Sequence, residues 1–280
     1  MRIVPVKKIE RLTESLAIKA NTILRKDIMA GIKKAFLDEK RPLAKMALGQ
    51  IIQNAKIAAR EKLAICQDTG LPVVFVELGQ EVFLKGGALD VAVNKGIKAA
   101  YKKSGFRRSI IQDPLRGKKD IQFTPVVIYV DIKRGEKIRL TVAPKGFGSE
   151  NVSRIKMFKP TAEAEEIIDF IVDTARRAGP AACPPFIIGI GMGGTLDKAV
   201  ILSKKALCCN IAKVNSSHIL SRLEGKVLKE VNKIKLGPMG FGGKHTALAV
   251  KILTDPTHIA GLPVAISISC HATRSATATI

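Results

Sequence analysis

The sequence predicts a mixed α/β (α+β) fold: mixed sheets flanked by helices, a helical N-terminal region, and cysteine-bearing loops that converge on one site. Apolar residues recur at helical spacing through roughly the first 60 residues. Beyond them, short β-branched runs alternate with further helical patterns. Cys66, Cys183 and Cys270 each lie at a loop-like junction between such elements. Three thiols at such junctions, far apart in the chain, indicate a site that the fold assembles.

Three helices are predicted in the N-terminal region. Apolar residues in Ile9–Leu37, and again in Pro42–Leu63, recur as on one face of a helix. Asn21 and Asp27 indicate a break that divides the first stretch into two helices. The apolar stripes of these helices are expected to serve packing only.

Strands and helices are expected to alternate after the turn at Cys66–Gly70. The next predicted elements are a strand at Val73–Val76, a helix at Leu84–Ser104, and β-rich segments at Pro125–Asp131 and Lys137–Pro144 joined by a hairpin at Arg134-Gly135. They are followed by a glycine-rich loop at Lys145–Asn151, a helix at Ala162–Ala178, a strand at Phe186–Ile190, a tight turn at Gly191–Gly194, helices at Leu196–Ile211 and Leu223–Ile234, a second glycine-rich loop at Gly237–Gly243, and strands at Thr246–Ile252 and Ala265–Ser269. No linker or internal repeat separates them, so residues 1–280 are expected to form one domain, either as a single body or with two lobes.

The net charge of +23 is the most unusual feature of the composition. Lys and Arg supply the salt-dependent phosphate term of nucleic-acid binding. However, the basic residues are dispersed along the chain, and the chain has no Trp and only two Tyr with which to stack bases. This pattern argues against nucleic acid as the partner. Small anionic substrates, an acidic partner subunit or a Lys-rich thermophile surface account for the charge equally well.

The five cysteines indicate reduced thiols in the cytoplasm. Their number is odd and they are widely dispersed, which is not the pattern of a disulfide framework. The basic segment Met1–Lys8 is not followed by the apolar segment and cleavage site of a signal peptide. Apolar runs such as Cys183–Met192 are interrupted by Pro and Gly and are too short to cross a bilayer. The thiols are therefore available for metal binding or catalysis, whereas the adjacent Cys208 and Cys209 are expected to act as small apolar residues within a helix.

One glycine run partly matches a nucleotide-binding motif. Gly189, Gly191 and Gly194 have the spacing G-x-G-x-x-G, after a predicted strand and before a predicted helix. No clear strand ending in Asp or Glu follows at the distance that a dinucleotide site needs, and a Cys-Pro-Pro run directly precedes the strand. A tight turn that brings a helix N-terminus to an anionic ligand is the preferred interpretation.

The spacing of Cys66, Cys183 and Cys270 matches neither a zinc ribbon nor a C-x-x-C ferredoxin pattern. Three thiolates on a four-iron cluster would leave one iron without a protein ligand. An open iron can bind a hydroxyl and a carboxylate as a Lewis acid. A hydro-lyase that acts on a hydroxy acid needs this chemistry, because hydroxide is a poor leaving group until a metal takes its charge.

Several motifs then occur together and in order. They are Cys-Gln-Asp-Thr-Gly at 66, Phe-Arg-Arg-Ser at 106, Lys-Gly-Phe-Gly-Ser-Glu-Asn at 145, Ala-Cys-Pro-Pro at 182, Gly-Met-Gly-Gly-Thr at 191, Gly-Phe-Gly-Gly-Lys-His-Thr-Ala-Leu at 240 and Pro-Thr-His-Ile-Ala-Gly-Leu-Pro-Val-Ala at 256. With these motifs the chain resembles the iron–sulfur class I fumarase and L-tartrate dehydratase family, specifically its N-terminal domain or α subunit. The resemblance extends from about Ala58 to Arg274, which is most of the chain.

The resemblance implies a [4Fe–4S] cluster held by Cys66, Cys183 and Cys270, with substrate bound at the fourth iron. It also implies a dicarboxylate pocket, whose residues in this chain would be Gln67, Asp68, Arg107, Gly148 and His258. The chemistry of these residues agrees: an arginine can hold a carboxylate in a bidentate manner, and a glycine backbone allows close approach. Asp68 and His258 are the candidates for positioning substrate or moving a proton.

Each of these roles has a structural alternative. Arg107 could be one of many solvated cations, and His258 could be a hydrogen-bonded core histidine. His245, His271 and Lys145 are weaker candidates for positions around the site, and His218 is expected at the surface. The stretch Gly117–Pro125 departs from the Asn/Thr-rich sequence of the family, which leaves the identity of the substrate open.

In the family, the catalytic base and several substrate-binding cations belong to a C-terminal domain, whereas this sequence ends at Ile280. The resemblance therefore implies a separate β subunit in a hetero-oligomer, and a chain that holds the cluster but needs its partner for turnover. The expected function is the reversible hydration of fumarate to (S)-malate, with L-tartrate dehydration as the first alternative. A basic nucleic-acid-binding protein without activity and a nucleotide-dependent oxidoreductase are two further possibilities.

Overall fold

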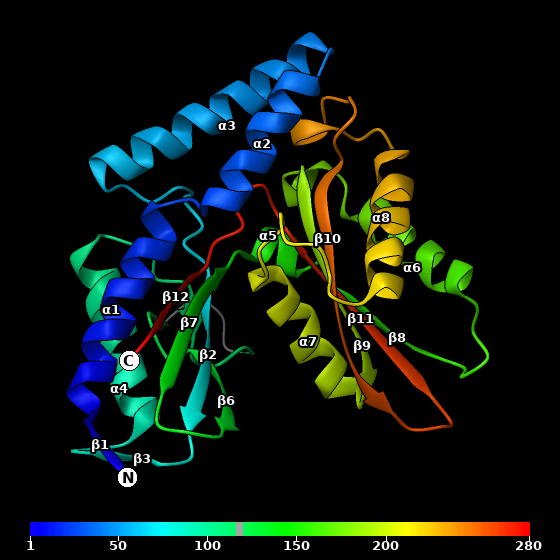
Figure 1. Cartoon of the computed structure of the whole chain (residues 1–280). Coiled ribbons are helices and arrows are strands. Elements are labelled where there is room, and N and C mark those ends of the chain that lie inside the picture. Colours follow the sequence, from blue (N-terminus) through cyan, green and yellow to red (C-terminus); the bar gives the residue numbers. More distant parts are fainter. Residues whose placement is uncertain (116–119) are drawn as a thin grey trace. The chain divides into compact units, whose positions relative to one another are not determined.

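The structure, a computed structural model, describes residues 1–115 and 120–280, and its chain divides into two compact units (Figure 1). The first unit contains Met1–Arg25, Ala55–Gly146 and Arg274–Ile280, and the second contains Lys26–Asn54 and Phe147–Thr273. Each unit has its own mixed sheet, its own helices and its own apolar core. The predicted mixed α/β class is confirmed.

The first unit is built on a four-stranded sheet with the strand order β12-β7-β2-β6. Its strands are β2 (Leu71–Gly79), β6 (Val127–Lys133), β7 (Ile138–Lys145) and β12 (Ala276–Thr279). Central strand β2 pairs in parallel with β6 and antiparallel with β7. Helix α1 (Val6–Thr22) contacts β7 and β12, and it packs closely on α4 (Leu89–Lys103). Gly96 allows that packing, because a Cβ there would lie 2.4 Å from the carbonyl oxygen of Glu10.

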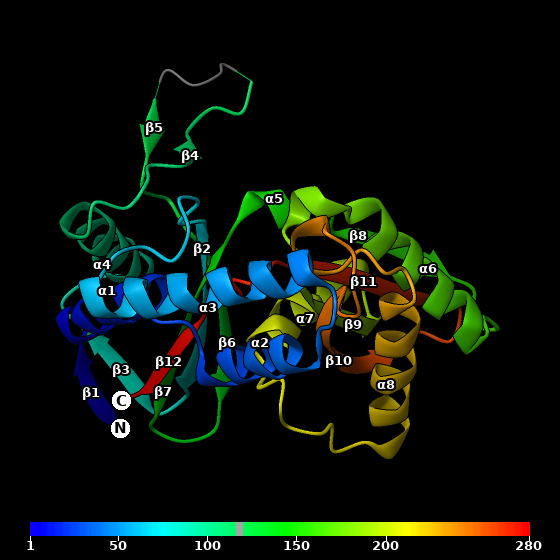
Figure 2. The ribbon, with the colours of Figure 1, turned by 90° about the horizontal axis from the view of Figure 1, so that it is seen from above.

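Two smaller pairs of strands complete the first unit. β1 (Arg2–Pro5) pairs in parallel with β3 (Val82–Lys85). β4 (Ile110–Ile111) pairs antiparallel with β5 (Ile121–Gln122), and this pair projects from the body of the unit (Figure 2). Within the stretch Gly117–Pro125, residues 117–119 lie outside the described residues.

The second unit is built on a sheet with the strand order β10-β9-β11-β8. Its strands are β8 (Arg154–Phe158), β9 (Phe186–Gly194), β10 (Ala247–Thr257) and β11 (Leu262–Ser269). Its helices are α2 (Lys26–Asp38), most of α3 (Pro42–Glu61), the short α5 (Phe147–Glu150), α6 (Ala164–Ala178), α7 (Leu196–Cys208), α8 (His218–Asn232), and the 3₁₀ turns η1 (Pro180–Ala182) and η2 (Pro238–Gly240).

Side chains along β9 point alternately to the two faces of the sheet, and helices cover both faces (Figure 1). Phe186, Ile188 and Ile190 enter the core that includes α6 and α8. Gly189 and Gly191 point the other way, where a Cβ would lie 2.2 Å from the carbonyl oxygen of Ser203 and 2.0 Å from that of Ala199, respectively. These two glycines let α7 pack directly on the strand, so close helix–strand packing accounts for the first two glycines of the G-x-G-x-x-G spacing.

The helices at the N-terminus agree with the sequence-based expectation. α1 and α2 are separated between Thr22 and Lys26, within the break that Asn21 and Asp27 predict, and α3 covers most of Pro42–Leu63. The strand at Val73–Val76 and the helix at Ala162–Ala178 are also present. Periodicity finds these elements because each of them buries one face.

Three local predictions about strands and their neighbours are wrong, and the glycine-rich loop expected at Lys145–Asn151 contains the short helix α5. First, β6 and β7 do not form a hairpin, because β2 lies between them and the intervening loop crosses the end of β2 at Gly79. Second, the helix predicted from Leu84 begins at Leu89, because Leu84 and Lys85 belong to β3. Third, Gly191–Gly194 continues strand β9 rather than forming a tight turn.

The N-terminus of α7 also differs from the expected anion site. Thr195 Oγ1 donates to the carboxylate of Asp197, which lies in the first turn of the helix. The pKa of Asp197 is lowered by that hydrogen bond. The helix N-terminus therefore already interacts with a negative charge from its own sequence.

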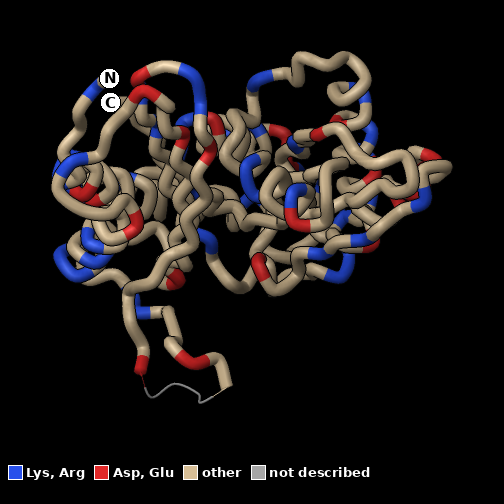
Figure 3. The backbone as a smooth tube through the Cα atoms, turned by 90° about the horizontal axis from the view of Figure 1, so that it is seen from below, with Lys and Arg blue, Asp and Glu red and all other residues tan. Residues whose placement is uncertain are grey.

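Lys and Arg are distributed over both units rather than gathered on one element (Figure 3). This agrees with their dispersal along the sequence. Within residues 1–115 and 120–280, no helix has the length and apolar character needed to cross a bilayer.

Candidate functional site

Cys66 lies in the turn that leads from α3 to β2 in the first unit. Its half-buried Sγ lies 3.3 Å from Oε1 of the exposed Gln67. Asp68 Oδ1 accepts a hydrogen bond from the backbone N–H of Gly70 at 3.0 Å, which closes the turn. Gly70 has a φ of +74°, and a Cβ there would lie 2.8 Å from the backbone of Lys145. Glycine is therefore required for the turn to pack this closely on the end of β7.

A buried arginine fixes the position of this turn. Arg274 is 5% exposed; its Nη2 donates to the carbonyl oxygen of Asp68 at 2.8 Å and its Nη1 to Oδ1 of Asn21 at 3.2 Å. A Cβ on Gly146 would lie 3.2 Å from Oδ2 of Asp68 and 3.7 Å from Nη2 of Arg274. Among the described residues, Arg274 Nε has no hydrogen-bond partner. The guanidinium thus holds the turn and keeps one buried N–H donor uncommitted.

A tyrosine and a threonine connect the turn to the segment that carries Arg107. Tyr101 donates from its hydroxyl to the carbonyl oxygen of Thr69 at 2.7 Å. Thr69 Oγ1 accepts the backbone N–H of Arg107 at 3.1 Å, whereas the side chain of Arg107 is exposed. Burial raises the pKa of Tyr101 to about 12, against the opposing effect of a hydrogen bond from Asn21. The structure therefore places the backbone of Arg107 next to the turn that carries Cys66, Gln67 and Asp68.

Cys183 and Cys270 meet at one end of the sheet of the second unit. Cys183 precedes β9 and Cys270 follows β11, and in this antiparallel pair Ser269 is opposite Ile187. The backbone N–H of His271 donates to the carbonyl oxygen of Cys183 at 3.2 Å, and His271 Nδ1 lies 3.2 Å from the same oxygen. Cys183 has a left-handed backbone, with φ +55° and ψ +65°. Strand register thus brings the two cysteine loops together.

Gly148 lies at the same end of this unit. It belongs to the short helix α5 rather than to an open glycine-rich loop. A Cβ on Gly148 would lie 3.4 Å from the carbonyl oxygen of Ala181, in the turn that leads to Cys183. Helix α5 also contacts β11, whose end leads into Cys270. Gly148, Cys183 and Cys270 are therefore neighbours in the second unit.

His258 lies at the opposite end of that sheet. It is exposed, in the turn between β10 and β11, and its Nδ1 accepts the backbone N–H of Ala260 at 3.1 Å. The eight residues of β11 separate this turn from Cys270, which corresponds to about 25 Å of extended chain. The structure does not bring His258 to the cysteines of its own unit. Its exposure also excludes the alternative that it is a core histidine.

The remaining candidates have varied environments. His245 is half-buried, and burial lowers its pKa, against the raising effect of the Glu39 charge. The side chain of Lys145 is largely buried near the Cys66 turn, with Nζ 3.3 Å from the carbonyl oxygen of Gly146. His218 is exposed at the start of α8, as predicted. Cys208 is the last residue of α7 and Cys209 caps that helix.

The chemistry of the donor set fits an iron–sulfur cluster. All five cysteines are among the described residues and none of them forms a disulfide; Cys66, Cys183 and Cys270 are half-buried in loops that precede or follow a strand. Thiolates are the ligands of iron–sulfur clusters. A closed structural zinc site would need a fourth ligand, which this set does not supply. One of the three thiols belongs to the first unit and two belong to the second.

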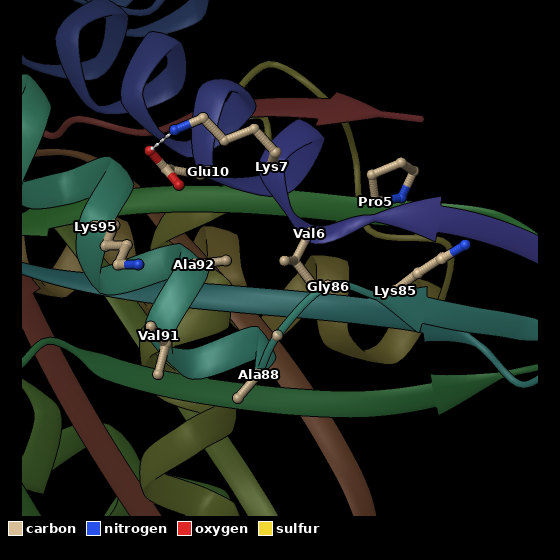
Figure 4. A pocket seen from close by; sticks show the side chains of 11 residues that line it. Pro5, Val6, Lys7, Glu10, Lys85, Gly86, Ala88, Val91, Ala92 and Lys95 are labelled. Carbon is tan, nitrogen blue, oxygen red and sulfur yellow. Dashed lines mark hydrogen bonds and ion pairs between the residues drawn. The ribbon is translucent and has the colours of Figure 1, made fainter.

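Among cavities lined by described residues, four lie within a single unit each, and none of these four is lined by Cys66, Cys183 or Cys270. One of about 350 Å³ lies in the first unit between the beginnings of α1 and α4 (Figure 4). Lys7, Lys85 and Lys95 line it, but Lys7 forms an ion pair with Glu10 at 2.6 Å, drawn as the dashed line in Figure 4. This cavity therefore combines charges of both signs and lies apart from the Cys66 turn.

Comparison with known proteins identifies the family. The family model described as fumarate hydratase (Fumerase) matches residues 10–279. A Methanocaldococcus jannaschii protein provisionally named L(+)-tartrate dehydratase subunit alpha is 34% identical over 277 residues, covering 96% of each chain. The L(+)-tartrate dehydratase subunit alpha of Escherichia coli strain UTI89 is 24% identical over 275 residues, covering 97% of this chain and 90% of its own.

The chain belongs to the fumarate hydratase (Fumerase) family, a family of hydro-lyases. The resemblance inferred from the ordered motifs is thereby confirmed. Mixed sheets with cysteine-bearing loops are the scaffold on which this chain presents its candidate site.

Two residues of the candidate site are not evident from the sequence alone. Arg274 is the only charged residue after Cys270, in a stretch of small and hydroxyl side chains, and this isolation is the one signal that could have found it. Tyr101 lies on the buried face of α4 and resembles any other core position in the sequence. Neither is adjacent in sequence to the Cys66 turn that both support.

Proposed function

We propose that this chain is the α subunit of an iron–sulfur hydro-lyase that interconverts fumarate and (S)-malate. The observation that carries the proposal is the set of three half-buried cysteines at strand ends, combined with the polar residues around the Cys66 turn, in a chain of this family. Cys66, Cys183 and Cys270 would hold a [4Fe–4S] cluster, which would supply Lewis acidity toward the substrate hydroxyl.

The residues of this chain have distinct proposed roles. The exposed guanidinium of Arg107 binds one substrate carboxylate, and the exposed amide of Gln67 donates a hydrogen bond to the substrate. The backbone at Gly148 lets the substrate approach closely. Asp68 is the proposed proton-handling residue, because it follows Cys66 and Gln67 in the same turn and its Oδ1 is held in place by the backbone N–H of Gly70.

The position of His258 changes its proposed role. Within one chain, about 25 Å of strand separates it from Cys270. We therefore leave His258 out of the site formed by the cysteines of its own chain. Catalysis is proposed to need further residues from a β subunit, because the relatives named above are called subunits alpha.

L-Tartrate is the second candidate substrate. The names of the relatives favour it, whereas the description of the family model favours fumarate. Both substrates are four-carbon dicarboxylates that gain or lose water at adjacent carbons, so Arg107 and Asp68 would serve either reaction. L-Tartrate differs from (S)-malate by one additional hydroxyl group.

The test is a direct comparison of the two reactions. The chain is produced without oxygen together with a β subunit of this family, and kcat/KM is measured for (S)-malate, fumarate and L-tartrate. We expect faster turnover of malate and fumarate than of tartrate. The Arg107→Gln variant is expected to lose activity toward all three substrates. Faster turnover of tartrate would replace the substrate assignment, and absence of all three activities in a cluster-loaded complex would reject the proposal.

A further inference from the structure

A cavity of about 470 Å³ in the second unit is lined by seven described residues, of which five are cationic. They are Arg41, Lys229, Asn232, Lys233, Lys235, Gly243 and Lys244; we call this cavity the basic pocket. None of the seven is acidic, in contrast to the cavity of Figure 4, where Glu10 is paired with Lys7. The volume is within the range of small-molecule sites.

The basic pocket is built by segments far apart in the sequence. Arg41 precedes α3, Lys229 lies in the last turn of α8, and Lys244 follows the glycine-rich loop after η2. Lysines at the end of α8 interact favourably with the helix dipole, which accounts for Lys229 and Lys233 without a ligand. The helix dipole does not account for Arg41 or Lys244, which come from other elements.

A buried carboxylate holds these segments together. Glu39 is 3% exposed; its Oε1 accepts the backbone N–H groups of Lys40 and Arg41, each at 3.0 Å, and its Oε2 accepts that of Lys244 at 2.8 Å. Burial would raise the pKa of Glu39, but these hydrogen bonds lower it below its ordinary value. Glu39 is therefore committed to the backbone beneath two of the cationic residues.

The glycines of the Gly240-Phe-Gly-Gly243 run make room for this arrangement. A Cβ on Gly242 would lie 2.6 Å from Nη1 of Arg41, and a Cβ on Gly243 would lie 2.5 Å from Oε2 of Glu39. Both glycines have positive φ, +76° and +113°. The Arg41 guanidinium thus rests on a surface that only glycine provides, which gives this run a role apart from the cysteine site.

We propose that the basic pocket binds a compact anion that carries several negative charges on phosphoryl groups, such as inorganic triphosphate. Five cations around one concavity repel each other, and a multivalent anion offsets that repulsion more than a single carboxylate does. Arg and Lys together suit phosphoryl oxygens, with Arg in a bidentate mode. The lining includes no aromatic ring, so it offers nothing on which a nucleobase would stack.

Asn232 adds an uncharged hydrogen-bond donor to the lining of the basic pocket. Its Oδ1 accepts the backbone N–H groups of Thr246 and Ala247 at 2.8 and 2.9 Å. The amide group can therefore offer a ligand only N–H donors, which also suit an anion. Lys233 forms an ion pair with Glu230 at 2.8 Å, so Lys229, Lys235 and Lys244 are the lysines to test.

The experiment is calorimetric titration of the full chain with inorganic triphosphate at low ionic strength. The test variant combines Lys229→Gln, Lys235→Gln and Lys244→Gln. The matched control combines Lys26→Gln, Lys33→Gln and Lys159→Gln, which removes the same charge from exposed positions of the same unit outside the pocket. Thermal melting verifies that both variants fold.

We expect saturable binding of one triphosphate per chain, weakened about tenfold or more in the test variant and less than about twofold in the control. Adenosine triphosphate is expected to bind about as tightly as triphosphate. The same binding is expected in Cys183→Ser, so the result does not depend on the proposed hydro-lyase activity.

Three outcomes would overturn the proposal. They are the absence of saturable triphosphate binding to the parent chain, an equal loss in the control variant, and much tighter binding of single-stranded RNA than of triphosphate. An equal loss of binding in the control variant would show that overall charge alone explains triphosphate binding. Tighter binding of RNA would make nucleic acid, and not a small anion, the ligand of the pocket.

Discussion

The two units bury charge in different places relative to their cysteines. In the first unit, buried Arg274 donates directly to the turn that carries Cys66. In the second unit, the buried ion pair of Lys251 and Glu224, 2.8 Å apart, lies between β10 and α8, on elements that carry neither cysteine. Cys183 and Cys270 are brought together instead by strand register and backbone hydrogen bonds.

This difference separates two ways of placing a reactive residue. Backbone hydrogen bonds between strands place Cys183 and Cys270, and every residue can form such bonds. Few individual side chains should therefore be critical for their placement. The Cys66 turn depends on a small set of buried polar side chains from distant parts of the sequence. Substitutions should therefore affect stability and the site together in the first unit, but separately in the second.

The largest effect is expected from Glu224→Ala. Its carboxylate also accepts a hydrogen bond from Asn215 and one from the backbone N–H of Ile252, so its removal leaves Lys251 buried without its countercharge. Breaking one side of a buried pair costs about 3–5 kcal/mol of unfolding free energy. Urea unfolding would measure this loss.

The control is Glu165→Ala, whose carboxylate is exposed and pairs with exposed Lys226; it should change stability by less than about 0.5 kcal/mol. A similar small change in both variants would contradict the burial of the pair.

Arg274→Met tests the coupling in the first unit. We expect a loss of about 2–4 kcal/mol, because the carbonyl of Asp68 and the amide of Asn21 lose their charged donor. Arg107→Met removes an exposed guanidinium and should cost less than about 0.5 kcal/mol. We also expect Arg274→Met, among chains that remain folded, to take up less iron. Normal iron uptake in this variant would show that the Cys66 turn does not depend on the guanidinium.

Tyr101→Phe should have a smaller, pH-dependent effect. At neutral pH it removes the hydrogen bond to Thr69, which costs about 1 kcal/mol. Burial raises the pKa of Tyr101 in the fold to about 12, above the value of about 10 in an unfolded chain. Its contribution is therefore complete below about pH 10 and is lost as the pH rises toward 12. Stability measured between pH 8 and 12 should fall more steeply in the parent than in Tyr101→Phe. Parallel curves would contradict the burial of the hydroxyl.

The smallest effect on the cluster is expected from His258→Ala. The side chain is exposed and accepts one hydrogen bond within its own turn, so the loss of stability should be about 0.5 kcal/mol. Iron content and visible absorption should match those of the parent. The comparison variant is His271→Ala, at the end of the sheet where Cys183 and Cys270 lie, which should lower iron content. A lower iron content in His258→Ala, with a normal content in His271→Ala, would contradict the assignment of His271, and not His258, to the end of the sheet that carries the cysteines.

Much of the fold could be predicted from sequence because its signals are local. The break at Asn21–Asp27 and the helix at Pro42–Leu63 follow from apolar spacing within the segment itself. The insertion of β2 between β6 and β7 could not be predicted, because pairing between distant strands leaves no mark on the loop at Arg134-Gly135. The extension of β9 through Gly194 was also hidden, because glycines that admit a packed helix look like glycines of a turn.

The candidate site could be predicted only in part, because some of its residues belong to local sequence motifs and others do not. The ordered motifs contain Cys66, Gln67, Asp68, Arg107 and Cys183, and the residue types themselves made them candidates. Arg274 was missed because its role depends on reaching a turn about 200 residues earlier in the chain, and only folding creates that contact. The separation of His258 from Cys270 was also not predicted, because strand β11 between them is longer than the strand expected at Ala265–Ser269.

The central claim is that three cysteines hold an iron–sulfur cluster, and anaerobic reconstitution with iron and sulfide tests it most directly. Iron content and visible absorption are measured for the parent, for Cys66→Ser, Cys183→Ser and Cys270→Ser, and for Cys208→Ser as the control. The account predicts a brown protein with about four irons per chain, lost in the first three variants and kept in the control. A colourless parent, or iron uptake that is indifferent to all four substitutions, would contradict it.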